Sequence, residues 1–435
     1  MKVLHTSDWH LGRGFHGTDL RQTQLEMIQT LCSAVDEHQV DVVLVAGDVF
    51  DRALPPEWAV RELGRCLRRL QQAGATVVMT SGNHDSAVRL GFNRELVAQA
   101  GVHIRSGLEE AWEPVEIDAA GERLLVYGVP YLEPQTYAEQ LGLDRANHTV
   151  VMTEVLGRIR ADATVRLGDG ARMSQAEAGS RSRTSAATET SQSRSPASSG
   201  TRVMVMAHVF AAHGTASESE RHIGAPAVPE QSLEHQENTA GGLAVVPLEL
   251  FEGFDYVALG HLHGRQRLAD RVRYSGSPIR YSFSEETQNK GAWLIDTAQL
   301  DDATAAVTGL DWSIGRRLKR LTGGIDEILA PELVEQHQDA FVQITLTDDQ
   351  RPERAYQRLR EVYPHLMHYS YAGPGLTSSA DSYAQRLQQA ESELDVVASF
   401  LQHVRSREAT QQELSTVQTA LDTIRAAPAA AREQA

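Results

Sequence analysis

Cysteine is nearly absent from this chain, since only Cys32 and Cys66 occur in 435 residues. Each falls on the apolar face of an expected helix, so we expect two small core residues rather than a disulfide or a zinc site. The chain has no apolar run of about 18 residues, the length that a membrane span needs. Its first residues, MKVLHTSDWH, lack the apolar core and cleavage site of a secretory signal. These absences predict a cytoplasmic protein.

Basic residues are also scarce. The chain has 41 Lys and Arg residues against 58 Asp and Glu residues, and its formal net charge is −17. Because phosphate contacts need cationic side chains, this balance argues against a protein that coats nucleic acid by itself. Metal ions held by carboxylates would supply positive charge locally, and a partner chain would supply a basic groove. We therefore expect weak binding of nucleic acid by this chain alone.

Apolar strands alternate with amphipathic helices in the first part of the chain, which predicts an α/β domain. The expected strands are residues 3–4, 41–45, 76–79, 124–127, 203–206, 256–259 and 292–295. Helices are expected at 25–35 and 55–74, the second beginning at a proline pair and ending at a glycine.

The length of the chain predicts two or three units. We expect a first domain at residues 1–300, a small α+β unit at 310–372 and a helical region at 380–425. Two polar stretches, about 168–200 and 224–242, are expected to be loops, the first a disordered insertion because it has few large apolar residues. The helical region carries an apolar stripe formed by Tyr383, Leu387, Leu394, Val397, Leu401 and Val404.

Polar motifs follow the ends of five expected strands. They are Asp8-Trp9-His10, Gly47-Asp48 with Asp51, Gly82-Asn83-His84-Asp85, Ala207-His208 and Gly260-His261-Leu262-His263. Alone, each is explained by a turn, a cap or a core histidine. In open α/β sheets, however, ligands bind at the carboxyl ends of strands, so five such motifs predict one shared site.

The donor atoms in these motifs are oxygens and imidazole nitrogens without thiolate, a set that suits Mn²⁺ or Fe²⁺ and suits Mg²⁺ less well. Two metals about 3.5–4 Å apart need a bridging carboxylate. Asp48 is the natural bridge because it lies in a tight Gly-Asp turn. The glycines before Asp48, Asn83 and His261 are expected to permit the sharp bends that direct these side chains.

The set DxH, GDxxD, GNHD, a strand-end histidine and GHxH resembles the calcineurin-like metallophosphoesterase superfamily. The segments HTSDWHLGR, AGDVFDRALPP, Ser217–Arg221, GHLHGRQ and RYSGSPIRYSFSE are similar, within it, to the SbcD family of bacterial nuclease subunits. The resemblance covers residues 1–300 well and the remainder more loosely. It implies a four-layer α/β sandwich of two mixed sheets flanked by helices, a small α+β capping domain, and C-terminal helices that dock on a coiled-coil ATPase of the SbcC type.

The resemblance also implies a ligand set for two divalent metal ions, which we expect to be Mn²⁺. The first metal would be held by Asp8, His10, Asp48 and His263, and the second by Asp48, Asn83, His208 and His261. His84 is not an expected ligand; it would stabilise charge on the scissile phosphate or protonate the leaving oxygen. Asp85 is expected to orient His84, and Asp51 is given an orienting role.

The activity implied is hydrolysis of phosphodiesters at DNA ends and hairpins, exonucleolytic on double strands and endonucleolytic on single strands, in DNA repair and recombination. Metal-activated water would be the nucleophile. A homodimer within a heterotetramer with the ATPase is implied as well.

Two alternatives share parts of this pattern. A protein phosphatase or cyclic-nucleotide phosphodiesterase would use the same ligands, but it would have no use for the added α+β unit and helices. A non-catalytic scaffold that recruits an ATPase to DNA ends would tolerate degenerate ligands, whereas all ligand types are present here. The apolar stripe predicts a docking helix, the alternative being a helix that packs on its own domain.

Overall fold

The computed structural model describes residues 1–119, 121–168, 200–215, 239–240, 243–373, 392, 394–399 and 409–426. Most of the expected loops at 168–200 and 224–242 lies outside the described residues, as do Ser217–Arg221, Tyr383, Leu387, Leu401 and Val404. The chain divides into two units, Met1–Leu318 and Lys319–Ala435. Within the described residues, no helix combines the length and the apolar character that crossing a membrane requires.

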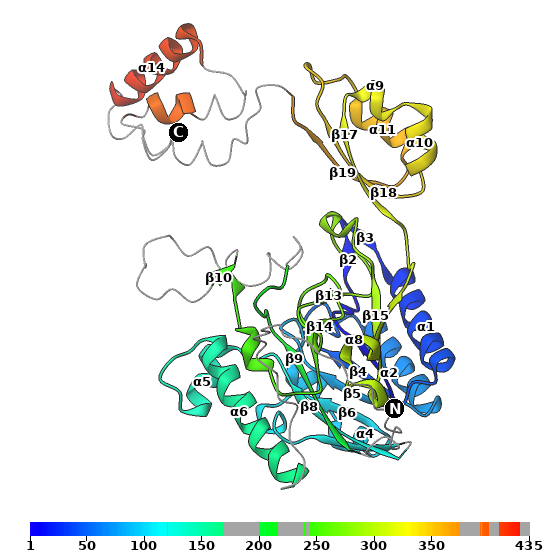
Figure 1. Cartoon of the computed structure of the whole chain (residues 1–435). Helices are drawn as coiled ribbons and strands as arrows, with labels where there is room; N and C mark the ends of the chain where they lie inside the picture. Colours follow the sequence, from blue (N-terminus) through cyan, green and yellow to red (C-terminus); the bar gives the residue numbers. More distant parts are fainter. Residues whose placement is uncertain are drawn as a thin grey trace, which may run out of the picture. The chain divides into compact units, whose positions relative to one another are not determined.

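The first unit contains two six-stranded sheets, both mixed in direction (Figure 1). The first sheet consists, in spatial order, of β16 (Val307–Asp311), β15 (Gly291–Asp296), β1 (Lys2–Thr6), β4 (Val42–Ala46), β5 (Thr76–Thr80) and β6 (Val102–Arg105). The second consists of β13 (Gln266–Arg267), β14 (Val272–Tyr274), β12 (Tyr256–Gly260), β9 (Thr201–His208), β8 (Glu122–Val129) and β7 (Val115–Ala119). All seven strands expected in this unit are present.

The central strands of both sheets are parallel, so their carboxyl ends point the same way within each sheet. β4 is buried at every residue because it is covered on both faces. Val42, Leu44 and Ala46 pack in a core shared with Met204, Met206 and Ala258 of the second sheet. His5 also crosses this core, with its ring nitrogens 3.0 Å from the Tyr256 hydroxyl and 3.2 Å from the Leu259 carbonyl oxygen.

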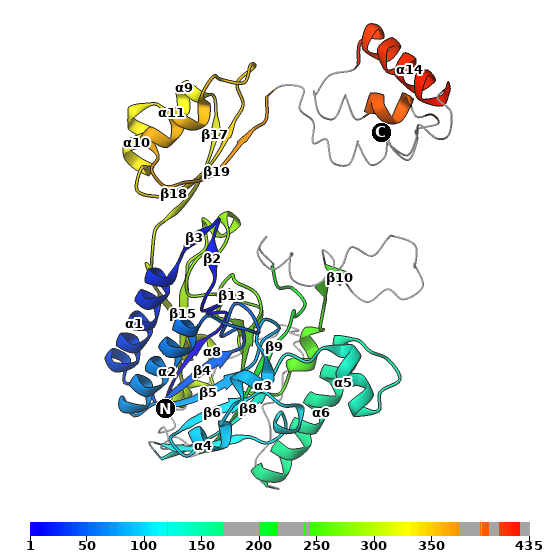
Figure 2. The same cartoon turned by 180° about the vertical axis from the view of Figure 1, so that it is seen from behind.

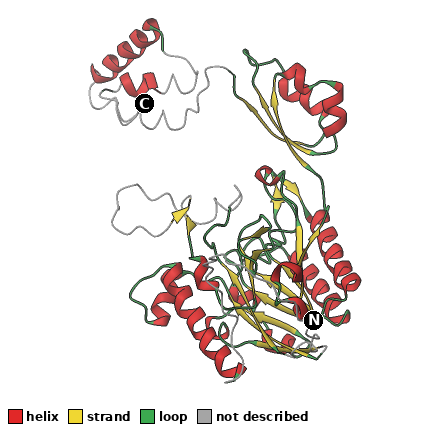
Figure 3. Cartoon of the chain, in the orientation of Figure 1, coloured by secondary structure: helices red, strands yellow, loops and turns green. Residues whose placement is uncertain are grey.

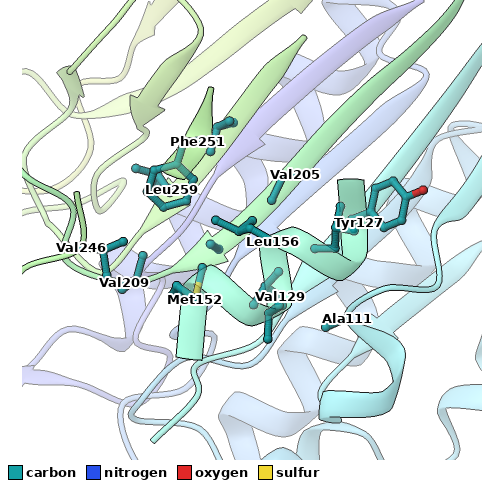
Figure 4. Packing of buried hydrophobic residues seen from close by; sticks show 14 of the residues in the cluster. Ala111, Tyr127, Val129, Met152, Leu156, Val205, Val209, Val246, Phe251 and Leu259 are labelled. Atoms are coloured by element: carbon teal, nitrogen blue, oxygen red, sulfur yellow. The ribbon is translucent and has the colours of Figure 1, made fainter. Parts of the chain in front are cut away.

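Helices cover the outer faces of the two sheets, which completes the expected α/β sandwich (Figures 1 and 2). Helices α1 (Arg21–His38) and α2 (Glu57–Gln72) lie on the first sheet, and Cys32 and Cys66 are free and buried there. Helices α5 (Pro134–Leu141) and α6 (His148–Leu167) lie on the second. Figure 4 shows Met152 and Leu156 of α6 packed among side chains of that sheet, including Val205 and Leu259.

Short elements connect these layers. They are the hairpin β2 (Gly14–Phe15) and β3 (Thr18–Asp19), the helices α3 (Ala87–Leu90), α4 (Arg94–Ala98) and α8 (Ala303–Ala306), the 3₁₀ turns η1 (Leu108–Glu110), η2 (Leu248–Phe251), η3 (Phe283–Glu285) and η4 (Thr297–Gln299), and the pair β10 (Thr239–Ala240) and β11 (Leu243–Ala244).

The second unit contains a small α+β body, visible in Figure 3 as a sheet beside a group of helices. Its elements are β17 (Leu318–Gly323), α9 (Ile325–Ile328), α10 (Pro331–His337), β18 (Phe341–Leu346), α11 (Ala355–Val362) and β19 (Leu366–Tyr371). The strands follow the order β17-β18-β19, and Val342, Ile344 and Leu359 are fully buried in their core. A further helix, α14 (Gln411–Ala426), occurs in the expected helical region.

The boundary between the units differs from the expected interval between residues 300 and 310. β16 pairs antiparallel with β15 from Val307 to Asp311, which ties these residues to the first sheet. Helix α6 was not expected either, because Thr153, Thr164 and Val165 on its exposed side weaken the contrast between its two faces.

We predict that Leu156→Ala destabilises the first unit by about 2–5 kcal/mol, because a fully buried side chain would leave a cavity between α6 and the second sheet. Val165→Ala, on the same helix but 80% exposed, is the matched control and should change stability by less than about 0.5 kcal/mol. Urea unfolding followed by circular dichroism measures both. Equal effects of the two substitutions would contradict the packing described for α6.

Candidate metal centre

Five strands bring the expected motifs to one place. Asp8 and His10 follow β1, Asp48 follows β4, and Asn83 follows β5, all in the first sheet. His208 ends β9, and His261 and His263 follow β12 in the second. The loops after β1 and β4 are joined by hydrogen bonds from the Asp8 and His10 amides to the Gly47 and Asp48 carbonyl oxygens, at 3.1 and 3.0 Å. The two sheets therefore deliver their carboxyl ends to a shared cluster.

The Asp48 carboxylate lies at the centre of the cluster and is 2% exposed. Its Oδ2 atom is 3.4 Å from His208 Nε2 and 3.6 Å from His10 Nε2, one histidine from each sheet. Its Oδ1 atom accepts the His84 amide hydrogen at 2.9 Å. A single carboxylate thus faces both halves of the site, the arrangement that a bridging ligand needs.

On one side of Asp48 lie Asp8, His10 and His263, with ligand atoms within 4.8 Å of one another. His10 Nε2 is 3.1 Å from His263 Nε2. The Asp8 carboxylate accepts a hydrogen bond from the Ser7 hydroxyl, and its two oxygens lie 3.1 and 3.2 Å from the His261 backbone nitrogen. All three side chains of this group are buried.

On the other side, two imidazoles approach one amide oxygen. Asn83 Oδ1 is 2.9 Å from His208 Nε2 and 3.2 Å from His261 Nδ1. The other ring nitrogen of His208 is 2.9 Å from the Ala46 carbonyl oxygen, which fixes the ring and turns Nε2 toward Asp48 and Asn83. The structure therefore brings together all seven residues expected to bind metal.

The backbone takes unusual conformations at four of these residues. Asp8, His10, Asp48 and His261 have φ values of 53°, 44°, 50° and 103°, in the left-handed region that residues with a Cβ rarely adopt. Each such residue costs about 1–3 kcal/mol, and this kind of strain concentrates at functional sites. The surrounding strands must therefore hold the four residues in place.

The glycines beside the ligands serve two different purposes. Gly47 has a φ of 83°, as its expected role in a sharp bend requires. Gly82 and Gly260 have no positive φ, so the expectation of a special backbone conformation was wrong for them. They provide space instead: a Cβ at Gly82 would lie 2.1 Å from Asp48 Oδ1, and one at Gly260 would lie 1.8 Å from the Ala46 carbonyl oxygen.

His84 lies at the edge of the cluster, with its ring 4.6 Å from that of His10. Its Nδ1 atom is 2.7 Å from the backbone oxygen of Asp51, and its Nε2 atom is 3.9 Å from Asp48 Oδ2. Nδ1 therefore donates to Asp51, which leaves Nε2 directed into the site. Nε2 is buried and has no hydrogen-bond partner among the described residues.

The role expected for Asp85 needs a correction. Its carboxylate accepts backbone hydrogen bonds from Val49, Phe50 and Gly82 at 2.9–3.0 Å, and does not contact the His84 ring in the hydrogen bonds of the described residues. Asp85 thus joins the loops after β4 and β5. The His84 ring is oriented by the backbone oxygen of Asp51. The carboxylate of Asp51 does not make this contact and lies 3.7 Å from Arg13 Nε.

The electrostatics match a site built for cations. Burial, and then Asp48, raises the pKa of Asp8 to about 6, although His208 and His263 act to lower it. Burial alone would raise the pKa of Asp48, but His208, His10 and His84 hold it well below its usual range. The pKa of His10 is well below its usual value because of burial. Burial therefore dominates at Asp8 and His10, whereas Asp48 keeps its negative charge through the neighbouring imidazoles, above all that of His208.

The residues present fit divalent metal ions. The donors are carboxylate, amide and imidazole atoms, and three overlapping groups of Asp and His side chains each converge within 4.8 Å. His84 Nε2, 3.9 Å from Asp48 Oδ2, is buried without a hydrogen-bond partner among the described residues, which is rare for a polar atom that has no further function.

Several residues next to the site gave no sequence signal of their own. Gln24 of α1 donates to the His10 carbonyl oxygen at 2.9 Å, and Tyr281 contacts the His10 ring with a centroid distance of 5.4 Å. Glu285 and Lys290 contact His263. None of them lies in a metal-ligand motif. Tyr281 and Glu285 fall within the RYSGSPIRYSFSE segment used for the family resemblance, whereas Gln24 and Lys290 lie outside it.

Comparison with known proteins adds independent findings. The family model described as calcineurin-like phosphoesterase matches residues 1–160, and that described as type 5 capsule protein repressor C-terminal domain matches residues 315–405. The SbcD subunit of the SbcCD nuclease from Bacillus subtilis (strain 168) is 28% identical over 375 residues, which are 85% of each chain. A solved structure, characterised as that of a novel archaeal phosphodiesterase, covers 72% of this chain and 100% of its own at 10% identity, but its TM-score of 0.27 is too low to support an argument.

We predict that Gly82→Ala disrupts the site, because the added Cβ would collide with the Asp48 side chain and backbone. The cost should be about 1–3 kcal/mol, with loss of Mn²⁺ binding in a calorimetric titration. Gly64→Ala, in the middle of α2 with no atom within 4 Å of its Cβ, is the matched control. It should retain metal binding and gain about 0.4–1 kcal/mol. Unchanged metal binding by Gly82→Ala would contradict the packing described here.

Proposed function

We propose that this chain, whose residues 1–160 match the calcineurin-like phosphoesterase family model, is the nuclease subunit of an SbcCD-type complex, which hydrolyses phosphodiesters at DNA ends and hairpins. The observation that carries the proposal is the position of Asp48, whose carboxylate faces histidines of both sheets. The match of the second unit to a family model supports the nuclease over a stand-alone phosphatase.

In this proposal two metal ions, most readily Mn²⁺, are held by the residues on either side of Asp48. The first would be held by Asp8, His10, Asp48 and His263, and the second by Asp48, Asn83, His208 and His261. When bound, the metals would lower the pKa of a water molecule and neutralise charge on the phosphate.

His84 would act on the substrate rather than on the metals. Its Nδ1 hydrogen is committed to the Asp51 backbone oxygen, so the protonated ring has one remaining donor, Nε2, which faces the site. That donor would bond to an oxygen of the scissile phosphate or deliver a proton to the departing oxygen. Asp85 would keep the loop that carries His84 against the loop that carries Asp48.

The second unit would bind the ATPase partner of the complex. In helix α14 the apolar residues Leu414, Val417 and Leu421 remain only partly buried. A helix with an incompletely covered apolar stripe suits a helix-in-groove or coiled-coil interaction. We propose that this region docks on a coiled-coil ATPase of the SbcC type, and that the complex works in the cytoplasm, where the free Cys32 and Cys66 would stay reduced.

We predict that the chain, assayed with and without an SbcC-type ATPase, cuts linear duplex DNA in Mn²⁺ and is inactive in EDTA. His84→Gln should lower cutting by about 10²–10⁴-fold because it removes the protonated donor. Mn²⁺ binding to this variant, measured by calorimetry, should stay near that of the wild type. His103→Gln, on the edge strand β6, is the matched control and should retain activity.

The substrates separate the proposal from its alternatives. If the chain hydrolyses a small nucleotide diester but does not cut DNA, even after addition of the ATPase, the nuclease proposal is wrong and the chain is a phosphatase or cyclic-nucleotide phosphodiesterase. If the chain retains the ATPase at DNA ends but hydrolyses neither substrate, it is a non-catalytic scaffold. Loss of Mn²⁺ binding in His84→Gln would show that His84 is a ligand rather than a donor to substrate.

We further propose that the chain forms a homodimer through an apolar surface beside the site, the α3–α4 surface, formed by Leu54, Val88, Phe92 and Leu96. These side chains are 64–84% exposed, a level that is uncommon for several large apolar residues in neighbouring segments. Arg89 of α3 donates to the Ala53 carbonyl oxygen at 3.0 Å, which places the loop carrying Leu54 next to α3. Self-association would cover this surface.

We predict that Phe92→Asp converts a dimer into a monomer in light scattering at micromolar concentration, because a carboxylate would be buried without a partner. Val165→Asp, on α6 and 80% exposed against 74% for Phe92, is the matched control and should stay dimeric. A monomeric wild type, or a Phe92→Asp variant that remains dimeric, would assign this surface to another partner.

A further inference from the structure

A buried ion pair lies directly behind one of the proposed ligands. Glu285 is 0% exposed and Lys290 is 2% exposed, and 2.7 Å separates Glu285 Oε2 from Lys290 Nζ. The desolvation of such a pair often exceeds its Coulombic gain, and a well-packed apolar pair is frequently as stable. The pair therefore calls for an explanation other than general stability.

The contacts of the pair converge on His263. Glu285 Oε1 is 3.2 Å from His263 Nδ1, and Lys290 Nζ donates to the His263 carbonyl oxygen at 2.7 Å. The ring and the backbone of the same histidine are thus held by opposite members of one ion pair. The other ring nitrogen, Nε2, faces the site 3.1 Å from His10 Nε2.

Lys290 is itself fixed in position. Besides Glu285 and the His263 backbone, its ammonium group donates to the Ser277 hydroxyl and to Gln288 Oε1, both at 2.9 Å. Glu285 in turn accepts the Tyr281 amide hydrogen at 3.1 Å. The carboxylate that meets His263 therefore has a defined orientation, and the pair adds no net charge to the site.

The same segment also supports the neighbouring ligand. The Tyr281 hydroxyl donates to the Trp9 carbonyl oxygen, and Gln24 Nε2 lies 3.3 Å from that hydroxyl and 2.9 Å from the His10 carbonyl oxygen. Residues 277–290 thus contact the Asp8–His10–His263 side of the site. Asn83 and His208, on the other side, are held by strand-end contacts instead.

We propose that Glu285 and Lys290 are a positioning pair that prepares His263 as a ligand of the first metal. The inference rests on the proposed function, since it requires the cluster to bind metal. A hydrogen on Nδ1 that is donated to Glu285 leaves the lone pair of Nε2 free for coordination, and the carboxylate makes the imidazole a stronger donor. Lys290 keeps the carboxylate aligned and prevents the loop of His263 from moving.

Calorimetric titration of the full chain with Mn²⁺ tests the pair. Wild type should bind two ions, and Glu285→Gln should weaken one of the two by about 10–100-fold while the other is unchanged. In the Glu285→Gln variant, at Mn²⁺ concentrations that fill only the tighter site, the electron paramagnetic resonance spectrum should show a single Mn²⁺ ion. The wild type should show the signal of two coupled ions. Glu62→Gln is the matched control, because Glu62 is a buried carboxylate that pairs with Arg65 on α2.

A double variant distinguishes positioning from plain stability. Glu285→Gln alone leaves Lys290 buried without its counter-charge, so the melting temperature should fall. Glu285→Gln combined with Lys290→Met removes both charges and should recover the melting temperature, yet the weakened metal site should stay weak. Recovery of metal affinity together with stability, or normal binding of both ions by Glu285→Gln, would overturn the positioning role. A wild type that binds no Mn²⁺ would instead refute the proposed function.

Discussion

The Asp48 carboxylate is buried between two β-sheets, with histidines of both sheets close to the same oxygen. A carboxylate taken out of water costs several kcal/mol even after relaxation, about the scale of a domain's whole stability, unless positive charge and hydrogen bonds replace the lost hydration. One amide hydrogen and the imidazoles of His10 and His208 supply only part of that replacement. The Asp48 carboxylate thus remains incompletely compensated for its lost hydration, and divalent cations would supply the missing positive charge. This requirement explains the rest of the site.

Holding such a cluster together requires a rigid frame. Four of its residues have positive φ, and three neighbouring glycines leave room for their backbone and side chains. The strain is offset by strands β1, β4, β9 and β12, which are buried except at the first residue of β1 and the first two of β9. Their apolar residues pack between the two sheets and, in the second sheet, also against α6. Stability and chemistry are therefore separated in space: side chains along the strands stabilise the fold, and side chains just beyond their ends form the site.

This separation explains which features the sequence predicts. The apolar runs of β1, β4, β5, β9 and β12 are plain in the sequence, and a polar motif after each run predicts the cluster without knowledge of the sheet order. The contacts that organise the cluster are not local. Asp85 looks like a partner of the adjacent His84, but its carboxylate is used by amides 35 and 36 residues away. Glu285 and Lys290 act on His263 from a segment with no periodicity, so a tertiary structure is needed to reveal them. The long helix α6 is not predicted for another reason. Its exposed face contains Thr and Val residues, so the difference in hydrophobicity between its exposed and buried faces is small.

The shortage of basic residues can be understood from the same arrangement. A net charge of −17 opposes the approach of a polyanion at long range, yet the reaction proposed here occurs on one. The charge that matters at the scissile phosphate is local, and two divalent ions would add four positive charges at the point where carboxylates are concentrated. Under the proposed function, affinity along the rest of the DNA would come from outside this chain, which agrees with a second unit whose helix α14 retains partly uncovered apolar residues. This distribution of charge favours a complex in which this chain hydrolyses the phosphodiester and a second chain holds the DNA.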